Sequence, residues 1–447
     1  MRVPQDPPST QILLQRTLTR PQRLMELVAM RSEDLPQHEE YLHWDKLRHL
    51  SPPAGLSHEE WWWLVKRGRQ SGRQGIPLRD KKGVSFSFSL VPEMFEALHH
   101  IDQRCAGNIA MPEQVTDGRT RDRYQINSLM EEAVTSSLLE GAAVTRQKAR
   151  DMLRSGRKPT DKSERMIVNN FKTMQHLLNI KDRPLTPELV FEIHAMISED
   201  ALDKPDGAGR LRRADEYIEV SDDLDNIFHI PPAASQLPGR LEDMCFFANE
   251  TGVNGFLHPV IRSIALHFWL AYDHPFVDGN GRTARALFYW SMLRGGYWLF
   301  QFISISQALL RSPSDYYRAF LHTEHDENDL NYFILHQLRC IETSIQDLHE
   351  YLARKSEQRR GLQIILRGLD WVNHRQQALL SHALEHDDAA YTFESHQRSH
   401  RISRMTAISD LRSLEEKGLL VSRLQGRQRV FRPIPNLETK LGTRTRP

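Results

Sequence analysis

Apolar residues recur every three to four positions from about residue 120 to residue 350, which is the spacing of amphipathic helices. Proline and glycine separate the segments, so helices are expected at residues 124–140, 144–155, 162–178, 186–198, 235–250, 258–272, 282–294 and 327–353. The segment 258–272 is apolar around most of its circumference, which is typical of a helix buried on all sides. The pattern predicts a mainly α fold, with a helical domain at residues 116–355.

Two short extended segments interrupt this helical pattern. The first is Tyr217, Ile218, Glu219 and Val220, and the second is residues 227–230, which two prolines follow. Extended runs that flank a polar stretch and end at proline favour a small β-hairpin.

The residues before the helical domain combine helix and strand signals. Val84, Phe86 and Phe88 alternate with serine, as in a strand, while neighbouring segments have helical spacing. We therefore expect a small α+β module at residues 23–115. A flexible N-terminus is expected at residues 1–22, because this segment is polar and contains proline.

After about residue 360 the pattern changes to short helices followed by two strands. Helices are expected near residues 371–386 and 393–401 and after Ser403, and strands at 420–423 and 430–432. This order resembles a winged helix-turn-helix, which is expected at residues 360–435 with a polar tail at 436–447.

Two uses of this C-terminal module remain open. From residue 371 to the C-terminus there are 13 Lys and Arg against 8 Asp and Glu, and a basic hairpin can hold DNA phosphates. The DNA-contacting residues would then be Arg404, Thr406, Ser409, Arg427 and Arg429. Protein contact, including homodimer packing, is the other use, because the basic excess is modest and two glutamates lie on the same helix.

Charge and cysteine content narrow the class of protein. The 447 residues carry 59 Lys and Arg against 58 Asp and Glu, so no global field favours nucleic acid. The basic stretch 66–73 is expected to be a solvated helix end. Three distant cysteines form neither a disulfide framework nor a zinc motif, so we expect a reducing, cytoplasmic location. No apolar stretch approaches the ~20 residues of a membrane span, so no membrane partner is expected.

The loop after the central helix concentrates reactive side chains. It has the sequence HPFVDGNGRTAR, from His274 to Arg285. Gly279 and Gly281 let the backbone approach a ligand closely, because they have no Cβ. The free N–H groups at the start of the next helix favour an anion such as a polyphosphate.

Five polar side chains complete this loop. Asn280 offers an amide donor, and Arg282 and Arg285 offer two guanidinium forks for phosphate oxygens. Asp278 is a suitable Mg²⁺ ligand, and His274 can accept a proton near neutral pH. Together these groups predict a site for attack on a phosphorus atom.

The loop differs from common phosphate and metal motifs. It lacks the GK[ST] of a Walker loop, and Arg282 stands where an EF-hand needs an oxygen ligand. It matches HPFxDGNGRxxR, the core motif of the Fic (Fido) family, at every specified position. This resemblance implies an all-α catalytic domain at residues 116–355 that transfers AMP from ATP to a Ser, Thr or Tyr hydroxyl of a target protein.

The resemblance also implies roles for individual residues. His274 would be the base, Asp278 the Mg²⁺ ligand, and Gly279, Asn280, Gly281, Arg282 and Arg285 the phosphate-binding residues. The hairpin at residues 216–230 lies where the family has a flap, which pairs with the backbone of the target.

A second motif lies upstream of the loop. Ser136 to Gly141 fits (S/T)xxxE(G/N), which resembles the inhibitory helix motif of the same family. Ser136 and Glu140 share one helix face. The Glu140 carboxylate is therefore expected to pair with Arg285 and to prevent productive seating of the triphosphate.

The same loop is compatible with other activities, and these alternatives remain open. In a hydrolase, Glu140 would orient water to remove AMP from a modified target. A sister enzyme would transfer UMP or phosphocholine. A transcriptional regulator would use the triphosphate site as a sensor and the C-terminal module to bind DNA. The target itself is open, and includes another copy of this chain.

Overall fold

A computed structural model describes residues 2–30, 41–70, 72–106, 118–221, 226–249, 255–367, 369, 371–385, 389–425 and 428–443. The chain forms two compact units, Met1–Leu348 and His349–Pro447. The division falls within one long helix, α16 (Asn331–Arg367). Most described residues are helical, which confirms the expected mainly α class. None of the described helices is both long and apolar enough to cross a bilayer.

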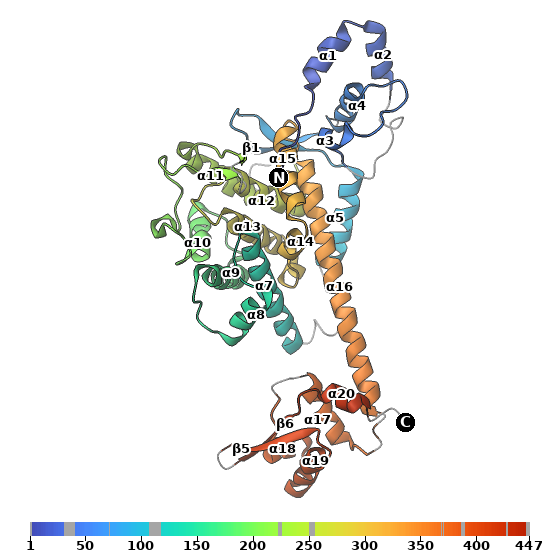
Figure 1. Cartoon of the computed structure of the whole chain (residues 1–447), viewed down its shortest axis with the longest axis vertical. Coiled ribbons are helices and arrows are strands. Elements are labelled where there is room, and N and C mark those ends of the chain that lie inside the picture. The colour runs from blue at the N-terminus through green and yellow to red at the C-terminus, as the bar shows by residue number, and fades with distance from the viewer. Residues whose placement is uncertain are drawn as a thin grey trace. The chain divides into compact units, whose positions relative to one another are not determined.

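The first unit is built from helices and two strand pairs. Besides α16 it contains α1 (Thr10–Leu18), α2 (Pro21–Ala29), α3 (Trp44–Leu47), α4 (His58–Gln70), α5 (Pro92–Cys105), α7 (Gly118–Leu139), α8 (Arg146–Ser155), α9 (Lys162–Ile180), α10 (Pro187–Ser198), α11 (Leu237–Ala248), α12 (Pro259–Asp273), α13 (Asn280–Arg294), α14 (Ile305–Arg311) and α15 (Pro313–His325) (Figure 1). The strands are β1 (Gln74–Arg79) with β2 (Ser85–Phe88), and β3 (Val220–Ser221) with β4 (Ile227–His229), both antiparallel. Every helix expected between residues 116 and 355 is present, and α14 and α15 are additional.

Helix α12 forms the centre of the first unit. Ile264, Phe268 and Trp269 are among its buried side chains, which cover the whole circumference as the sequence pattern indicated. Helix α13 packs along α12, and α7, α9 and α10 contact α13. A helix without a polar face is enclosed in this way because each Å² of apolar surface left in water costs about 25 cal/mol. The loop between α12 and α13 is therefore supported by core on both sides.

The N-terminal residues share this core. Phe86 and Phe88 of β2 are buried, and the Phe86 ring lies 5.2 Å from that of Phe268 and 5.0 Å from that of Tyr272 in α12. Val84 is exposed, so the expected alternation holds only within the short strand. The strand pair β1–β2 is thus fixed by packing against the central helix.

The second unit begins with the C-terminal part of α16, and its further described elements are helices and one strand pair. These are α17 (His374–Glu385), α18 (Phe393–His400), α19 (Arg404–Glu416), antiparallel β5 (Leu420–Gln425) and β6 (Gln428–Pro433), and α20 (Leu437–Thr443). Ser403 caps α19 by accepting a hydrogen bond from the Thr406 N–H at 3.1 Å. Leu411, Leu414 and Phe431 form the core of this unit. The elements follow the order expected for a winged helix-turn-helix.

The structure corrects the expectations for both ends of the chain. Within residues 1–22, α1 is helical and buries Leu13, so this segment is not wholly irregular. Within residues 436–447, α20 buries Leu437 and Leu441 in the core of the second unit. Both helices are too short to stand out by periodicity, and tertiary packing stabilises them.

A buried ion pair replaces the expected solvated helix end at residues 66–73. Lys66 is only 1% exposed, and its Nζ donates to Asp326 Oδ1 at 2.8 Å. Asp329 Oδ2 lies 3.9 Å from the same nitrogen. The Lys66 ammonium lowers the pKa of Asp326, against the effect of burial. The prediction that Lys66 is solvated was wrong, because its partner carboxylates lie far along the chain. The pattern of polar and apolar residues along one helix cannot reveal such partners.

We expect Lys66→Met to lower the free energy of unfolding of the first unit by about 3 kcal/mol, because it leaves two buried carboxylates without their cation. Urea unfolding followed by tryptophan fluorescence measures this change. The matched control is Lys172→Met, because Lys172 pairs with Glu199 on the surface of the same unit with 57% of its side chain exposed. The control should cost less than about 0.5 kcal/mol. Equal effects would show that the buried pair contributes nothing beyond a surface pair.

Candidate active site

Two residues with left-handed backbone define the loop between α12 and α13. His274 ends α12 with φ of 45°, and Gly279 precedes α13 with φ of 81°. The Asn280 side chain closes the turn, because its Oδ1 accepts from Phe276 N at 2.9 Å and its Nδ2 donates to Phe276 O at 2.8 Å. Asn280, expected among the phosphate-binding residues, therefore also holds the loop in shape.

Two residues that the sequence did not single out support this loop. Arg212 Nε donates to His274 O at 2.9 Å. His194 Nε2 lies 2.9 Å from Asp278 O, and its ring stacks on Phe276 at 3.7 Å between centroids. Both are distant from the loop in sequence, and neither belongs to a motif. Only the tertiary structure reveals them.

The His274 ring is oriented by its own helix. Its Nδ1 lies 3.1 Å from Ala271 O. Because a carbonyl can only accept, Nδ1 carries the proton and Nε2 keeps its lone pair. Burial lowers the pKa of His274 to about 4. The imidazole is therefore neutral at pH 7 and can accept a proton at Nε2.

The two loop arginines are buried at the start of α13. Arg282 Nη1 donates to Ile197 O at 3.4 Å, and its Nε and Nη2 make no hydrogen bond within the described part of the chain. Arg285 Nη1 is likewise without a hydrogen-bond partner there. Desolvation lowers the pKa of Arg282. A buried N–H group without a hydrogen-bond acceptor costs free energy, so these guanidinium groups are suited to bind an anion such as a phosphate.

The carboxylate of Glu140 lies over the anion cradle, by which we mean Arg282, Arg285 and the first turn of α13. Glu140 Oε1 accepts from Arg285 Nη2 at 2.9 Å, and Ser136 Oγ accepts from Arg285 Nε at 2.9 Å. A Cβ built on Gly281 would lie 2.2 Å from Glu140 Oε1, so the carboxylate covers the first turn of α13. Gly141, with φ of 84°, ends the segment that begins at Ser136. The expected pairing of Glu140 with Arg285 is confirmed.

A cavity of about 370 Å³ opens beside the loop. Its lining comprises Glu140, Tyr217, Ile218, Glu219, His274, Val277, Asp278, Gly279, Asn280 and Gly281. The Asp278 side chain is 44% exposed, and its Oδ1 accepts from Gly279 N at 2.5 Å. No cluster of three metal-binding side chains occurs in the described residues. One open carboxylate beside a phosphate cradle nevertheless suits Mg²⁺, which is often held by a single carboxylate together with substrate phosphates.

The hairpin beside the cavity is shorter than expected. Only Val220 of the first predicted segment is in a strand, where it pairs with His229. Tyr217 precedes the strand, is 71% exposed, and donates its hydroxyl to Glu219 at 2.9 Å. The segment is extended next to the cavity without being fully paired, so its backbone can meet another chain.

The predicted DNA-contacting residues occupy different environments in the second unit. Arg404, Ser409 and Arg429 are exposed. Thr406 is half-buried, and its hydroxyl lies 2.9 Å from that of the N-cap serine. Arg427 lies outside the described residues. Three of the five residues are thus accessible on α19 and β6.

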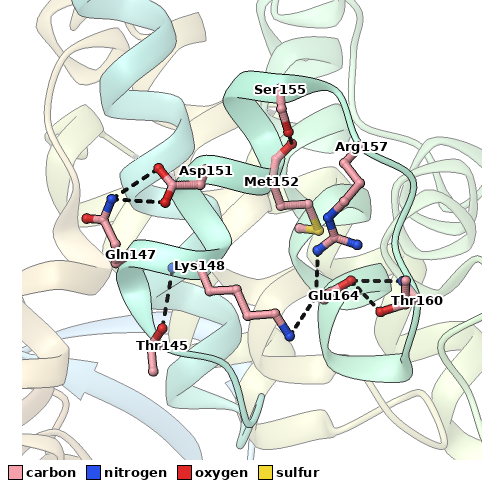
Figure 2. Close-up of a pocket in the computed structure, with 9 residues that line it drawn as sticks. All are labelled: Thr145, Gln147, Lys148, Asp151, Met152, Ser155, Arg157, Thr160 and Glu164. Carbon is pink, nitrogen blue, oxygen red and sulfur yellow. Dashed lines mark hydrogen bonds and ion pairs between the residues drawn. The ribbon is translucent and has the colours of Figure 1, made fainter.

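In a second hollow, between α8 and α9, charged and polar lining residues pair with one another. Figure 2 shows Lys148 and Arg157 converging on Glu164, which is buried. Glu164 accepts from Arg157 at 2.7 Å, from Lys148 at 3.1 Å, and from both the N–H and the hydroxyl of Thr160. Its oxygens are fully used, so this hollow offers no reactive group.

The fold and the loop define a mainly helical domain with an anion-accepting turn beside a neutral histidine. Residues 184–292, from α10 into α13, match the model of the Fic/DOC family. This part of the chain is therefore a Fic/DOC family domain. A Fic family protein of Desulfovibrio desulfuricans has the same fold, with a TM-score of 0.52 at 17% identity over 78% of this chain and 98% of that one.

Curated relatives share part of the chain. Protein adenylyltransferase Fic of Nematostella vectensis is 26% identical over 243 residues, which are 54% of this chain and 51% of that protein. The protein of the same name in Drosophila mojavensis is 36% identical over 93 residues, 21% of this chain and 17% of the relative. The matches thus span about half, or less, of the length of these relatives.

The contact between Glu140 and Gly281 predicts that Gly281→Ala changes the stability in opposite directions in the presence and in the absence of the Glu140 side chain. In the wild type, Gly281→Ala should destabilise the first unit by about 1 kcal/mol, because the new methyl displaces the carboxylate from Arg285. In a Glu140→Ala background it should stabilise by about 0.5 kcal/mol, because alanine restricts the unfolded chain. Urea unfolding of the four proteins gives the coupling energy. The same sign in both backgrounds would contradict the contact.

Proposed function

We propose that this chain transfers AMP from ATP to a hydroxyl of a target protein, and that Glu140 holds this activity in check. The observation that carries the proposal is a neutral histidine beside two buried arginines, several of whose nitrogens have no hydrogen-bond partner among the described residues. The names of the curated relatives support the same class of reaction.

In this proposal the loop binds the triphosphate. The first N–H groups of α13, together with Arg282 and Arg285, hold phosphate oxygens. Gly279 and Gly281 let the backbone approach them. Asp278 would hold Mg²⁺, which neutralises phosphate charge when bound. The positive end of the helix and the buried guanidinium groups stabilise charge that develops on the phosphates.

His274 acts on the incoming hydroxyl. Its Nε2 accepts the hydroxyl proton while the hydroxyl oxygen forms a bond to the α-phosphorus of ATP. The bond from that phosphorus to the bridging oxygen breaks, and its electron pair leaves with pyrophosphate. AMP remains joined to the target through the new P–O bond. Because burial keeps His274 neutral at pH 7, no deprotonation has to precede this step.

Glu140 opposes this reaction by occupying the cradle. Its carboxylate takes an Arg285 donor that a phosphate oxygen would otherwise use, and it lies against Gly281 where a phosphate would approach. A negative charge there repels the triphosphate. The flap at Tyr217, Ile218, Glu219 and Val220 borders the same cavity, and we propose that its backbone pairs with an extended segment of the target.

Glu140→Gly should raise protein labelling from ATP carrying label on the α-phosphate at least tenfold, because it clears the anion cradle. The measurement is label on protein after incubation with Mg²⁺ and the labelled ATP. His274→Ala/Glu140→Gly should abolish the gain, since no base remains. Glu199→Gly is the matched control, because Glu199 is an exposed glutamate at the end of α10.

Unchanged labelling in Glu140→Gly, with His274 intact and ATP bound, would contradict the brake and the transfer reaction. Two further outcomes identify the alternatives. Loss of AMP from a labelled target only when Glu140 is present would indicate the hydrolase. Labelling from a UMP or phosphocholine donor, without labelling from ATP, would indicate a sister transferase.

For the second unit we propose DNA binding as a separate function. Arg404 and Ser409 are exposed on α19, and Arg423 and Arg429 are exposed on neighbouring strands of the hairpin. Helix and hairpin therefore both carry cations that can contact phosphates, while Ser409 can reach a base edge. This arrangement supports DNA binding over a purely structural use of the unit.

Full-length protein should bind a 30-bp duplex of random sequence with an affinity that falls as salt rises, measured by fluorescence anisotropy. Arg404→Ala and Arg429→Ala should each reduce the slope of log K against log salt by about 0.9 for one lost phosphate contact. Arg354→Ala, which removes an exposed arginine of α16, should leave the slope unchanged. Absence of duplex binding at low salt, or dimerisation through this unit instead, would contradict the proposal.

A further inference from the structure

A third cavity lies away from the α12–α13 loop. Its volume is about 430 Å³, and it is enclosed by the segment around α3 and by α14, α15 and α16. It shares no lining residue with the cavity beside His274. A hollow of this size suits a small organic ligand.

The walls of this cavity carry more positive than negative charge. Lys46, Arg311, Arg318 and Arg339 line it, and Asp315 is the one acid in the lining. Asp315 is already engaged, since it accepts from a serine hydroxyl and pairs with Arg318 at 3.4 Å. Arg311 pairs with Asp347, which lies outside the lining, at 2.6 Å. The lining itself comprises four cationic side chains and one carboxylate.

Burial is the largest cause of the lowered pKa values of His336 and His322, which both line the cavity. Burial, together with the charge of Arg339, lowers the pKa of His336 to about 4. Burial and the charges of Arg318 and Lys46 lower the pKa of His322 to about 3. These histidines are neutral at pH 7, so they add no charge of their own.

Aromatic and apolar groups form the remaining wall. The rings of His43 and His322 stack at 4.1 Å between centroids with an angle of 7°. Tyr41 and Tyr332 lie beside them, with their rings 5.1 Å apart in an edge contact. Leu335 adds an aliphatic side chain. A ligand that combines an anionic group with a less polar portion fits both kinds of wall.

We propose that this cavity between α3, α15 and α16 binds a small phosphorylated ligand. The guanidinium groups of Arg318 and Arg339 hold the phosphate, because their planar forks match phosphate oxygens. The aromatic wall contacts the organic portion. This binding is independent of the nucleotide site, and it places a ligand against α15, whose Tyr316 hydroxyl lies 2.9 Å from His267 Nε2 in α12.

Calorimetric titration of the full chain at low ionic strength tests this site. Ribose 5-phosphate, inorganic phosphate and ribose are the three probes. We expect ribose 5-phosphate to bind and ribose not to bind. Arg339→Ala and Arg318→Ala should each weaken binding at least tenfold, while Arg354→Ala, an exposed arginine on the same helix as Arg339, should leave it unchanged. Equal affinity for inorganic phosphate would assign the site to free phosphate.

Two results would overturn the proposal. One is the absence of binding of either phosphate compound at millimolar concentration. The other is binding that survives Arg339→Ala and Arg318→Ala but is lost in Arg282→Ala, because the ligand would then lie in the α12–α13 loop. Arg318 is half-buried and Arg339 is exposed, so their replacement should leave the fold intact, which circular dichroism checks.

Discussion

The burial of Arg285 at the first turns of α13 constrains much of the first unit. A guanidinium group removed from water needs acceptors. Ser136 of α7 and Glu140, the residue after this helix, supply them. This requirement fixes the C-terminal end of α7 against the loop. It also brings a carboxylate to the N-terminal end of a helix, where the helix dipole favours negative charge. One interaction therefore stabilises the domain and holds a carboxylate against the first turn of α13.

The buried charged residues of this protein fall into two groups. In one group the hydrogen-bonding groups all have partners, and in the other group some donors have none among the described residues. Lys66 with Asp326, and Glu164 with its four donor groups, are complete networks that tie segments together. Arg282 and Arg285 differ because several of their donors meet no acceptor among the described residues. An incomplete network in a folded domain is costly, and a ligand that completes it gains that energy on binding.

The sequence by itself determined the class of fold and the chemistry of the loop. Alternation of apolar and polar residues depends on which side chains face the core, and the helices followed that pattern closely, from α7 to α13. The loop could also be recognised because its reactive groups lie within twelve consecutive residues, from His274 to Arg285. Glu140 could be linked to Arg285 only through a motif, and the structure confirms the contact.

Only the tertiary structure decided which distant residues complete these sites. Arg212 and His194 hold the loop through its carbonyl oxygens, and Lys66 finds its carboxylates 260 or more positions away. The short helices α1 and α20 and the basic cavity between α3 and α16 were likewise invisible in the sequence. The physical reason is common to all of them. Periodicity records the environment of a residue relative to its own helix or strand, whereas long-range partners are set by how those elements pack.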